Sequence, residues 1–208
     1  TCPWFLLGLT MLGGISFADD IHSVPNKFRL IVHFAAMTLM FYQWGILLPE
    51  YWWVVIIALI VCTGIINAYN FMDGINGITG GYSLAVLIPL LLLNMQEEYT
   101  DNNFIIVTLL SVLVFCLFNF RTRAKCFAGD VGSVSIAFIL LYFLGSYILQ
   151  SGNYWAIVLL MVYGVDSVLT ICHRIMLHEN IGQPHRKHAY QLMANELQIK
   201  HVTVSTIY

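Results

Sequence analysis

The sequence predicts an all-α fold, a polytopic bundle of transmembrane helices with about seven spans. Of the 208 residues, 59% are hydrophobic and 10% are charged, whereas soluble domains carry about 25% charged residues. The apolar residues gather in runs that mostly approach the roughly 20 residues needed to cross a bilayer as a helix. Because backbone groups cannot stay unpaired in lipid, helices are the structure expected of such runs.

Each expected span is bounded by a polar stretch. The first, third, fifth and seventh runs end at "DD", "NAYNFMDGINGITGG", "NFRTRAKCF" and "HRIMLH", while the second, fourth and sixth end at "PEY", "NMQEEYTDNN" and "QSGNY". The fourth and fifth runs are short, so they could be poorly tilted or could be extended by their flanks. The seven runs cover residues 3–18, 28–48, 51–68, 82–95, 104–119, 133–150 and 154–172.

The chain is expected to form one transmembrane domain over residues 1–208, since no internal repeat, low-complexity tract or long linker divides it. It begins without Met inside an apolar segment, and its end, "HVTVSTIY", resembles the start of another span. We therefore expect a fragment of a larger multi-span protein, truncated at both ends. Five scattered cysteines without a C-x-x-C pair argue against a disulfide framework or a zinc site.

The basic residues predict the orientation. If all seven runs cross the membrane, every Lys and Arg lies on one side, and the only charged residues in the loops of the other side are acidic. The positive-inside rule places the basic side in the cytoplasm. The residues on that side are Lys27, Arg29, Arg121, Arg123, Lys125, Arg174, Arg186, Lys187 and Lys200.

Four polar clusters follow the odd-numbered spans, so alternating crossing brings all of them to the cytoplasmic side. They contain Asp19 with Asp20, Asp73, Asp130, and the basic segment "PHRKHAYQ". Packed helices could gather these ends around a single cleft. The aspartates offer the hard oxygen ligands that suit Mg²⁺ together with substrate phosphates, and Arg forks match phosphate geometry.

Each cluster also has a plainer interpretation. Asp19 and Asp20 could be a solvated pair, and Asp130 part of a helix-start turn. Asn67, Asn70 and Asp73 recur every three residues and could bind substrate or join helices. The basic segment could be attracted to anionic lipid.

Two ionisable residues lie inside spans, where such groups are functional candidates. For His33 a packing role is favoured. Asp166 could pair with Arg174 or orient a neighbouring group.

The ordered motifs "DD", "NAYNFMDGINGITGG", "NF…AKCFAGDVGS" and "HRKHAYQ" resemble those of the polyprenyl-phosphate N-acetylhexosamine-1-phosphate transferases, glycosyltransferase family 4. The resemblance runs from about Thr10 to the C-terminus. It implies a multi-pass enzyme of the bacterial inner (cytoplasmic) membrane whose active site faces the cytoplasm. Such an enzyme transfers an N-acetylated sugar 1-phosphate from a UDP-sugar to undecaprenyl phosphate and releases UMP. Mg²⁺, or alternatively Mn²⁺, is the implied cofactor; no nucleic acid is involved, and a homodimer is left open.

By matched position the resemblance also implies roles. Asp19 and Asp20 correspond to the paired aspartates near the lipid phosphate, with Asp19 a proposed base. Asp130 corresponds to the metal-binding aspartate, and Asp73 to an aspartate with a catalytic or metal role. The implied substrate-binding residues are Asn67, Asn70, Lys125, His185, Arg186 and His188.

The departures from the family pattern bear on the substrate. Ser23 stands where the lipid I enzyme has a further acid, and His-Arg-Lys-His replaces three histidines, which disfavours the muramoyl-pentapeptide substrate. UDP-N-acetylglucosamine or a UDP-N-acetylated deoxyhexose, for O-antigen or another envelope glycan, is favoured. Asn76 replaces a frequent Asp; it keeps the oxygen but loses the charge, which argues against a catalytic or metal role at that position.

An ion-coupled transporter is the main alternative from another class, with Asp130 and Asp166 as its carboxylates. Transporters usually place their sites at the bilayer midplane and show repeated halves. This chain gathers its acids at one face and shows no repeat, so the transferase is preferred.

Overall fold

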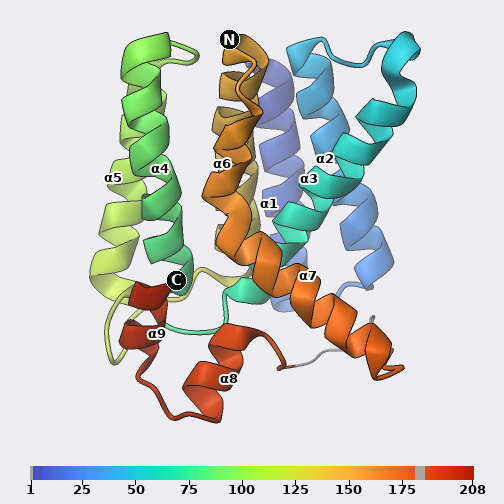
Figure 1. Cartoon of the computed structure of the whole chain (residues 1–208). Helices are drawn as coiled ribbons and strands as arrows, with labels where there is room; N and C mark the ends of the chain where they lie inside the picture. Colours follow the sequence, from blue (N-terminus) through green and yellow to red (C-terminus); the bar gives the residue numbers. More distant parts are fainter. Residues whose placement is uncertain (1, 181–185) are drawn as a thin grey trace. The chain divides into compact units, whose positions relative to one another are not determined.

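The structure is a computed structural model that describes residues 2–180 and 186–208. Over these residues the chain forms nine α-helices, two short 3-10 helices and no strand (Figure 1). The all-α prediction is confirmed. The helices are α1 (Pro3–Ile21), α2 (Asn26–Trp44), α3 (Trp52–Met72), α4 (Ile78–Glu97), α5 (Asn102–Asn119), α6 (Gly129–Ser151), α7 (Met161–Met176), α8 (Ala189–Asn195) and α9 (His201–Ile207), with 3-10 helices η1 (Pro49–Tyr51) and η2 (Tyr154–Leu160).

Six helical segments of the described chain are long and apolar enough to cross a membrane. They begin at Pro3, Pro49, Ile78, Asn102, Gly129 and Tyr154, and they match six of the seven expected spans. The remaining expected span, 28–48, forms the 19-residue helix α2, which is not among the six. Lys27, Arg29 and His33 lie in its first half and reduce its apolar character.

The helices belong to two compact units. Unit 1 comprises Thr1–Asn70 and Ala128–Gly152, and unit 2 comprises Phe71–Phe127 and Asn153–Tyr208. Unit 1 is therefore built from α1, α2, nearly all of α3, and α6. Unit 2 contains α4, α5, α7, α8 and α9.

In unit 1, α1 packs against both α2 and α6. Phe5 of α1 stacks on Phe138 of α6 with 5.4 Å between ring centroids. A Cβ atom at Gly8 would lie 2.9 Å from the Phe138 ring, so this glycine permits the close approach of α1 and α6. Trp44, at the end of α2, donates from Nε1 to Ser146 Oγ of α6 at 3.1 Å.

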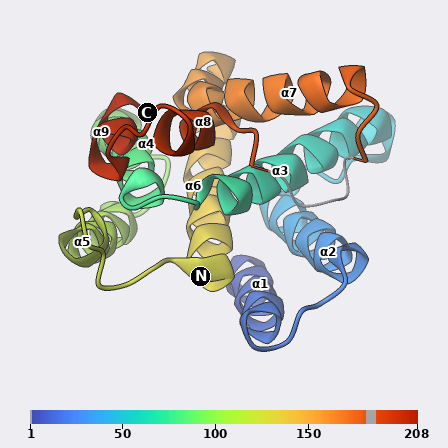
Figure 2. The same cartoon turned by 90° about the horizontal axis from the view of Figure 1, so that it is seen from below.

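In unit 2, α4 packs along α5, and α9 packs against both α4 and α8 (Figure 2). Tyr82 of α4 stacks on Tyr163 of α7 with 3.8 Å between ring centroids. The Tyr82 hydroxyl also donates to the carbonyl of Leu159 in η2 at 3.0 Å. Aromatic packing therefore joins the two halves of unit 2 that are far apart in the sequence.

Large apolar side chains remain exposed along the long helices. On α3, Trp53, Ile57 and Ile60 expose 56%, 54% and 60% of their surface. Contiguous exposure on this scale is unfavourable in water and suits a lipid environment. The chain is therefore a multi-pass membrane protein.

Candidate functional site

Arg29 lies at the centre of a charged cluster in unit 1. Its guanidinium contacts Asp19 Oδ2 at 2.5 Å and Asp130 Oδ2 at 2.6 Å. These carboxylates come from the end of α1 and the start of α6, and Arg29 from the first turn of α2. The structure therefore brings together two acids that are more than a hundred residues apart, through a cation that the sequence motifs did not single out.

Asn70 extends this cluster from α3. Its Oδ1 accepts from Arg29 at 3.4 Å, and its Nδ2 donates to Ser133 Oγ of α6 at 3.3 Å. Asn67, one turn earlier, instead donates to the Thr63 carbonyl of its own helix at 2.8 Å. Of the two predicted substrate-binding asparagines, Asn70 thus joins the cluster directly.

Asp20 contacts the beginning of α6. The backbone N–H of Asp130 donates to Asp20 Oδ1 over a long 3.4 Å. Gly129 has φ of +61°, and a Cβ there would lie 3.2 Å from Asp20 Oδ2. Glycine is suited to this backbone conformation, so it lets a carboxylate approach the positive end of the α6 dipole.

The donor chemistry of the cluster suits a hard cation. With every acid ionised, three carboxylates and one guanidinium leave the cluster two negative charges. Among the residues that the structure describes, no three His, Cys, Asp or Glu side chains form a group that could hold a metal ion. Mg²⁺ nevertheless needs only one or two carboxylates when substrate phosphates and waters supply the other ligands. Asp19 and Asp130 meet that requirement.

His33 lies one turn after Arg29 on α2 and is fully buried. This burial agrees with the favoured packing role. Neither of its ring nitrogens has a hydrogen-bond partner within the described parts of the chain. His33 is therefore packed without the hydrogen bonds that usually accompany a buried polar group.

Asp73 belongs to unit 2, where it follows the end of α3. Its Oδ1 accepts from the Thr79 hydroxyl at 2.6 Å, in the first turn of α4. The neighbouring Gly74 packs against Tyr190, whose hydroxyl leaves no room for a Cβ atom at this position. Tyr190 also donates to the Phe71 carbonyl at 2.8 Å, so α8 is fastened to the segment that carries Asp73. The expected convergence of Asp73 with the unit 1 acids stays a prediction.

Tyr190 has an altered acidity because of these neighbours. Burial first, and then the negative charges of Asp73 and Asp166, raise the pKa of Tyr190 above its usual value. The hydroxyl is therefore held in its neutral, donating form.

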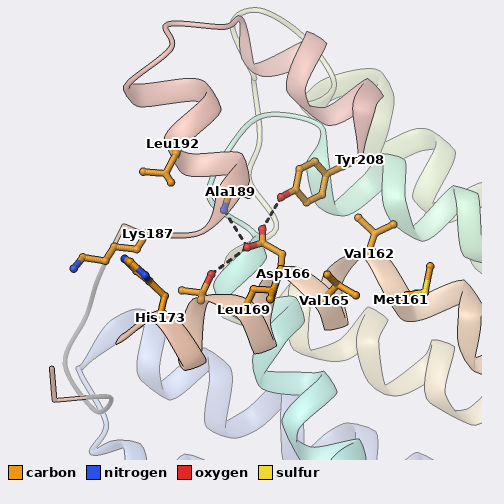
Figure 3. Close-up of a pocket in the computed structure, with 11 residues that line it drawn as sticks. Met161, Val162, Val165, Asp166, Leu169, His173, Lys187, Ala189, Leu192 and Tyr208 are labelled. Atoms are coloured by element: carbon orange, nitrogen blue, oxygen red, sulfur yellow. Dashed lines mark hydrogen bonds between the residues drawn. The ribbon is translucent and has the colours of Figure 1, made fainter. Parts of the chain in front are cut away.

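Asp166 connects α7, α8 and Tyr208, the residue after α9, in unit 2 (Figure 3). Its Oδ1 accepts from Thr170 at 3.1 Å and from the Ala189 backbone N–H at 3.0 Å, while Oδ2 accepts from the Tyr208 hydroxyl at 2.5 Å. His188 Nδ1 lies 3.4 Å from Oδ1. Of the two alternatives for Asp166, these contacts favour orientation of neighbouring groups, because Arg174 instead bonds Glu179 and the Asn180 carbonyl.

The structure places two of the three predicted substrate-binding residues of the basic segment. Arg186 is exposed, and His188 is buried beside Asp166. His185 lies outside the described residues. Lys187, between them, bonds Glu179 and lowers the pKa of that carboxyl. An apolar pocket of about 590 Å³ lies beside this segment, with Asp166, His173, Lys187 and Tyr208 among its lining residues (Figure 3).

Lys125 is exposed on the loop after α5 in unit 2.

Sequence reasoning counted Arg29 only for membrane orientation and passed over Tyr208 and Thr170. A basic residue ten positions after the paired aspartates was the available signal for Arg29. The partners of Asp166 gave no such signal, since they come from separate elements.

The chain is similar to known proteins of one family. The family model described as Glycosyl transferase family 4 matches residues 2–150. A phospho-N-acetylmuramoyl-pentapeptide-transferase of Thermotoga neapolitana is 30% identical over 148 residues, 63% of this chain and 48% of the relative. A transferase of the same name from Fervidobacterium nodosum is 30% identical over 164 residues, 70% of this chain and 50% of the relative.

A third relative has a different name. The probable undecaprenyl-phosphate N-acetylglucosaminyl 1-phosphate transferase of Bacillus subtilis is 31% identical over 153 residues, 70% of this chain and 42% of the relative. The chain thus spans about half the length of the curated relatives it matches. Two of these three names contain the N-acetylmuramoyl-pentapeptide group. This is the substrate that Ser23 and the His-Arg-Lys-His segment disfavour.

Proposed function

Because the chain belongs to glycosyl transferase family 4, we propose that the protein transfers an N-acetylated sugar 1-phosphate from a UDP-sugar to undecaprenyl phosphate. The reaction takes place at the cytoplasmic face of the bacterial inner membrane and releases UMP. UDP-N-acetylglucosamine or a UDP-N-acetylated deoxyhexose is the proposed donor. The product would begin O-antigen or another envelope glycan.

The observation that supports this function best is the cluster around Arg29. Asp19, Asp130 and Asn70 reach the same guanidinium from three different helices. This arrangement lies at helix ends, where a helix that crosses lipid would meet water. A membrane-borne phosphate and a water-soluble nucleotide must meet at such a boundary.

Charge is the main obstacle to the reaction. An oxygen of the lipid phosphate attacks the sugar-linked β-phosphate, and both groups are anionic, so catalysis depends on positioning and on offsetting charge. Arg29 supplies a planar fork that matches phosphate geometry. Asp130, with Asp73 as the resemblance implies, would hold Mg²⁺. When bound, this ion would stabilise negative charge on the transferred phosphate.

Asp19 and Asp20 have different proposed roles. A phosphate monoester has its second pKa at about 6, so the lipid phosphate is mostly dianionic at neutral pH and needs little help from a base. Asp19 is therefore a base of secondary importance, and its contact with Arg29 orients the guanidinium. Asp20 contacts the start of α6 and so positions Asp130.

On the donor side, we assign Lys125, Arg186 and His188 to binding of the nucleotide sugar, with His185 as a further candidate. Asn67 and Asn70, on the polar stripe of α3, are further proposed substrate-binding residues.

The reaction is a single displacement, so no phospho-sugar becomes attached to an aspartate.

The test is UMP release by the purified protein in lipid nanodiscs. We expect release only when UDP-sugar, undecaprenyl phosphate and Mg²⁺ are all present. Asp130→Ala should abolish turnover, whereas Asp19→Asn should retain part of it because a base is dispensable. Glu50→Gln, an exposed acid of unit 1, is the matched control and should keep wild-type activity. Turnover without lipid phosphate, or equal loss in both aspartate variants, would contradict the respective proposal.

UDP-N-acetylmuramoyl-pentapeptide is the second candidate donor. The names of the Thermotoga and Fervidobacterium relatives favour it. A panel that compares this donor with UDP-N-acetylglucosamine and UDP-N-acetylated deoxyhexoses decides between them.

A further inference from the structure

The loop that follows α5 carries three cations. Residues 120–127, which we call the basic loop, include Arg121, Arg123 and Lys125, and all three side chains are exposed. The loop contains no acidic residue. Three like charges on one short loop repel one another, so the loop needs fixed anchors to keep one conformation.

Asn76 provides one anchor. Its Nδ2 donates to the Arg121 carbonyl at 3.0 Å and to the Thr122 carbonyl at 3.4 Å. Both partners are carbonyl oxygens, which only accept, so the amide nitrogen must face them. The Asn76 backbone carbonyl is itself held by the Ser205 hydroxyl of α9 at 2.8 Å.

Asn119 provides a second anchor, and the Lys125 backbone N–H also donates to the Phe118 carbonyl at 2.9 Å. Its Nδ2 donates to the Cys126 carbonyl at 2.8 Å, and its Oδ1 accepts from the Gly77 backbone N–H at 2.8 Å. Gly77 has φ of +91° and packs against the Phe120 ring, where a Cβ would lie 2.6 Å away. The segment Asn76–Gly77 therefore holds the start of the basic loop directly and its end through Asn119.

An aspartate at position 76 could not do this. An ionised carboxylate has no hydrogen to donate, so it would face two carbonyl oxygens with its own negative charge. The amide is thus required by the contacts of this chain, although the family resemblance places Asp at this position in many members.

We propose that Asn76 is a positioning residue that holds the basic loop, and that the loop binds the diphosphate of the nucleotide sugar. The second part rests on the proposed function. The positioning role predicts that Asn76→Asp, which restores the residue more frequent in the family, opens the basic loop.

The first experiment measures the loop without any substrate. Arg121, Arg123 and Lys125 are trypsin sites, so the rate of cleavage after them reports how often the loop opens. We expect cleavage at least tenfold faster in Asn76→Asp than in wild type, with a smaller increase in Asn76→Ala, which removes the donors and adds no charge. Asn195→Asp makes the same charge change at an exposed residue of unit 2 and should leave the rate unchanged.

The second experiment measures ligand binding by the same loop. UDP should slow trypsin cleavage of the wild-type loop, and Lys125→Gln should remove this protection. In turnover assays with saturating lipid phosphate, Asn76→Asp should raise the KM for the nucleotide sugar at least tenfold and change kcat much less. A merely structural defect would instead lower the active fraction and so kcat.

The outcomes separate the two claims. A loop as protected in Asn76→Asp as in wild type, or higher activity in that variant, overturns the positioning role. An opened loop with unchanged KM and no protection by UDP overturns the binding role. If wild type turns over no nucleotide sugar, the proposed function fails, while cleavage rates and UDP protection still decide this inference.

Discussion

At the scale of single residues, Arg29 has the most consequential position in the charged cluster. One guanidinium satisfies two carboxylates and an amide oxygen at once. Lysine has the same charge but lacks the planar fork that reaches several acceptors. The chemistry of the cluster therefore depends on the shape of this side chain as well as on its charge.

Substitutions of Arg29 test that dependence. A charge-assisted hydrogen bond is worth about 1.5–3 kcal/mol, so Arg29→Ala should lower kcat/KM by about 10- to 100-fold or more. Arg29→Lys should recover part of the loss, because it restores the charge. The measurement is UMP release at subsaturating UDP-sugar. Wild-type kcat/KM in Arg29→Ala would show that the cluster does not take part in turnover.

Tyr190 allows a prediction about pH. Its raised pKa means that the folded state favours the neutral hydroxyl. The resulting stabilisation is fully present below the unfolded pKa of about 10 and is lost as the pH rises through the folded value. The unfolding temperature should therefore fall more steeply with rising pH above pH 10 in wild type than in Tyr190→Phe. Parallel curves would contradict the raised pKa.

The same variant tests one hydrogen bond at neutral pH. Tyr190→Phe loses the bond to the Phe71 carbonyl, and a typical hydrogen bond contributes about 1 kcal/mol. A lowered unfolding temperature at pH 7 is the expected result. Tyr154→Phe, at an exposed tyrosine of unit 2, serves as the control.

At the scale of elements, Asp166 determines how α7, α8 and the end of the chain after α9 are joined. One carboxylate accepts from α7 itself, from the first residue of α8 and from Tyr208. These hydrogen bonds fix the start of α8 and therefore the position of His188.

Variants of Asp166 separate hydrogen bonding from charge. Asp166→Asn keeps an acceptor at Oδ1 and can donate to Tyr208, so we expect little loss of stability. Asp166→Ala loses three hydrogen bonds of about 1 kcal/mol each, so its free energy of unfolding should fall by about 3 kcal/mol. Denaturant unfolding in detergent measures both. A large loss in Asp166→Asn would show that the charge is essential.

Much of the element scale follows from the sequence. Apolar runs predicted α3 and α5 closely, because length and composition alone decide whether a segment can cross lipid. The short run 82–95 is extended by its flanks, which was one of the two expectations for it: α4 spans Ile78–Glu97, and its first glycines pack against Cys116 and Phe120. That packing requires a partner helix, which a run of apolar letters does not show.

The site was harder to predict for the same reason. Asp19, Asp20 and Asp130 were identified from their motifs, but their meeting at Arg29 depends on how α1, α2 and α6 pack. The contacts of Asn76 and Asp166 likewise involve the Arg121 carbonyl and the Tyr208 hydroxyl. Residue type and spacing carry no signal for partners that only tertiary structure brings together.

At the scale of the whole molecule, α2 decides the membrane topology. The predicted orientation requires it to cross, although it is less apolar than the six candidate spans. Single cysteines at His22 and Glu50 flank it, in a background without the native cysteines. A membrane-impermeant maleimide added outside intact cells should label Glu50→Cys and leave His22→Cys unlabelled. Equal labelling of both would show that α2 does not cross.

The order of segments in unit 1 has a consequence for biogenesis. This unit needs residues 1–70 and 128–152, so the ribosome must synthesise α4 and α5 before α6 can complete it. Asp19 can meet Arg29 early, but Asp130 emerges a hundred residues later. The first three helices must therefore remain in the translocon or bilayer without the contact between Arg29 and Asp130. If translation paused or the chain were truncated before α6, these helices would remain without their packing partner. Membrane quality-control proteases would then have access to their exposed polar ends.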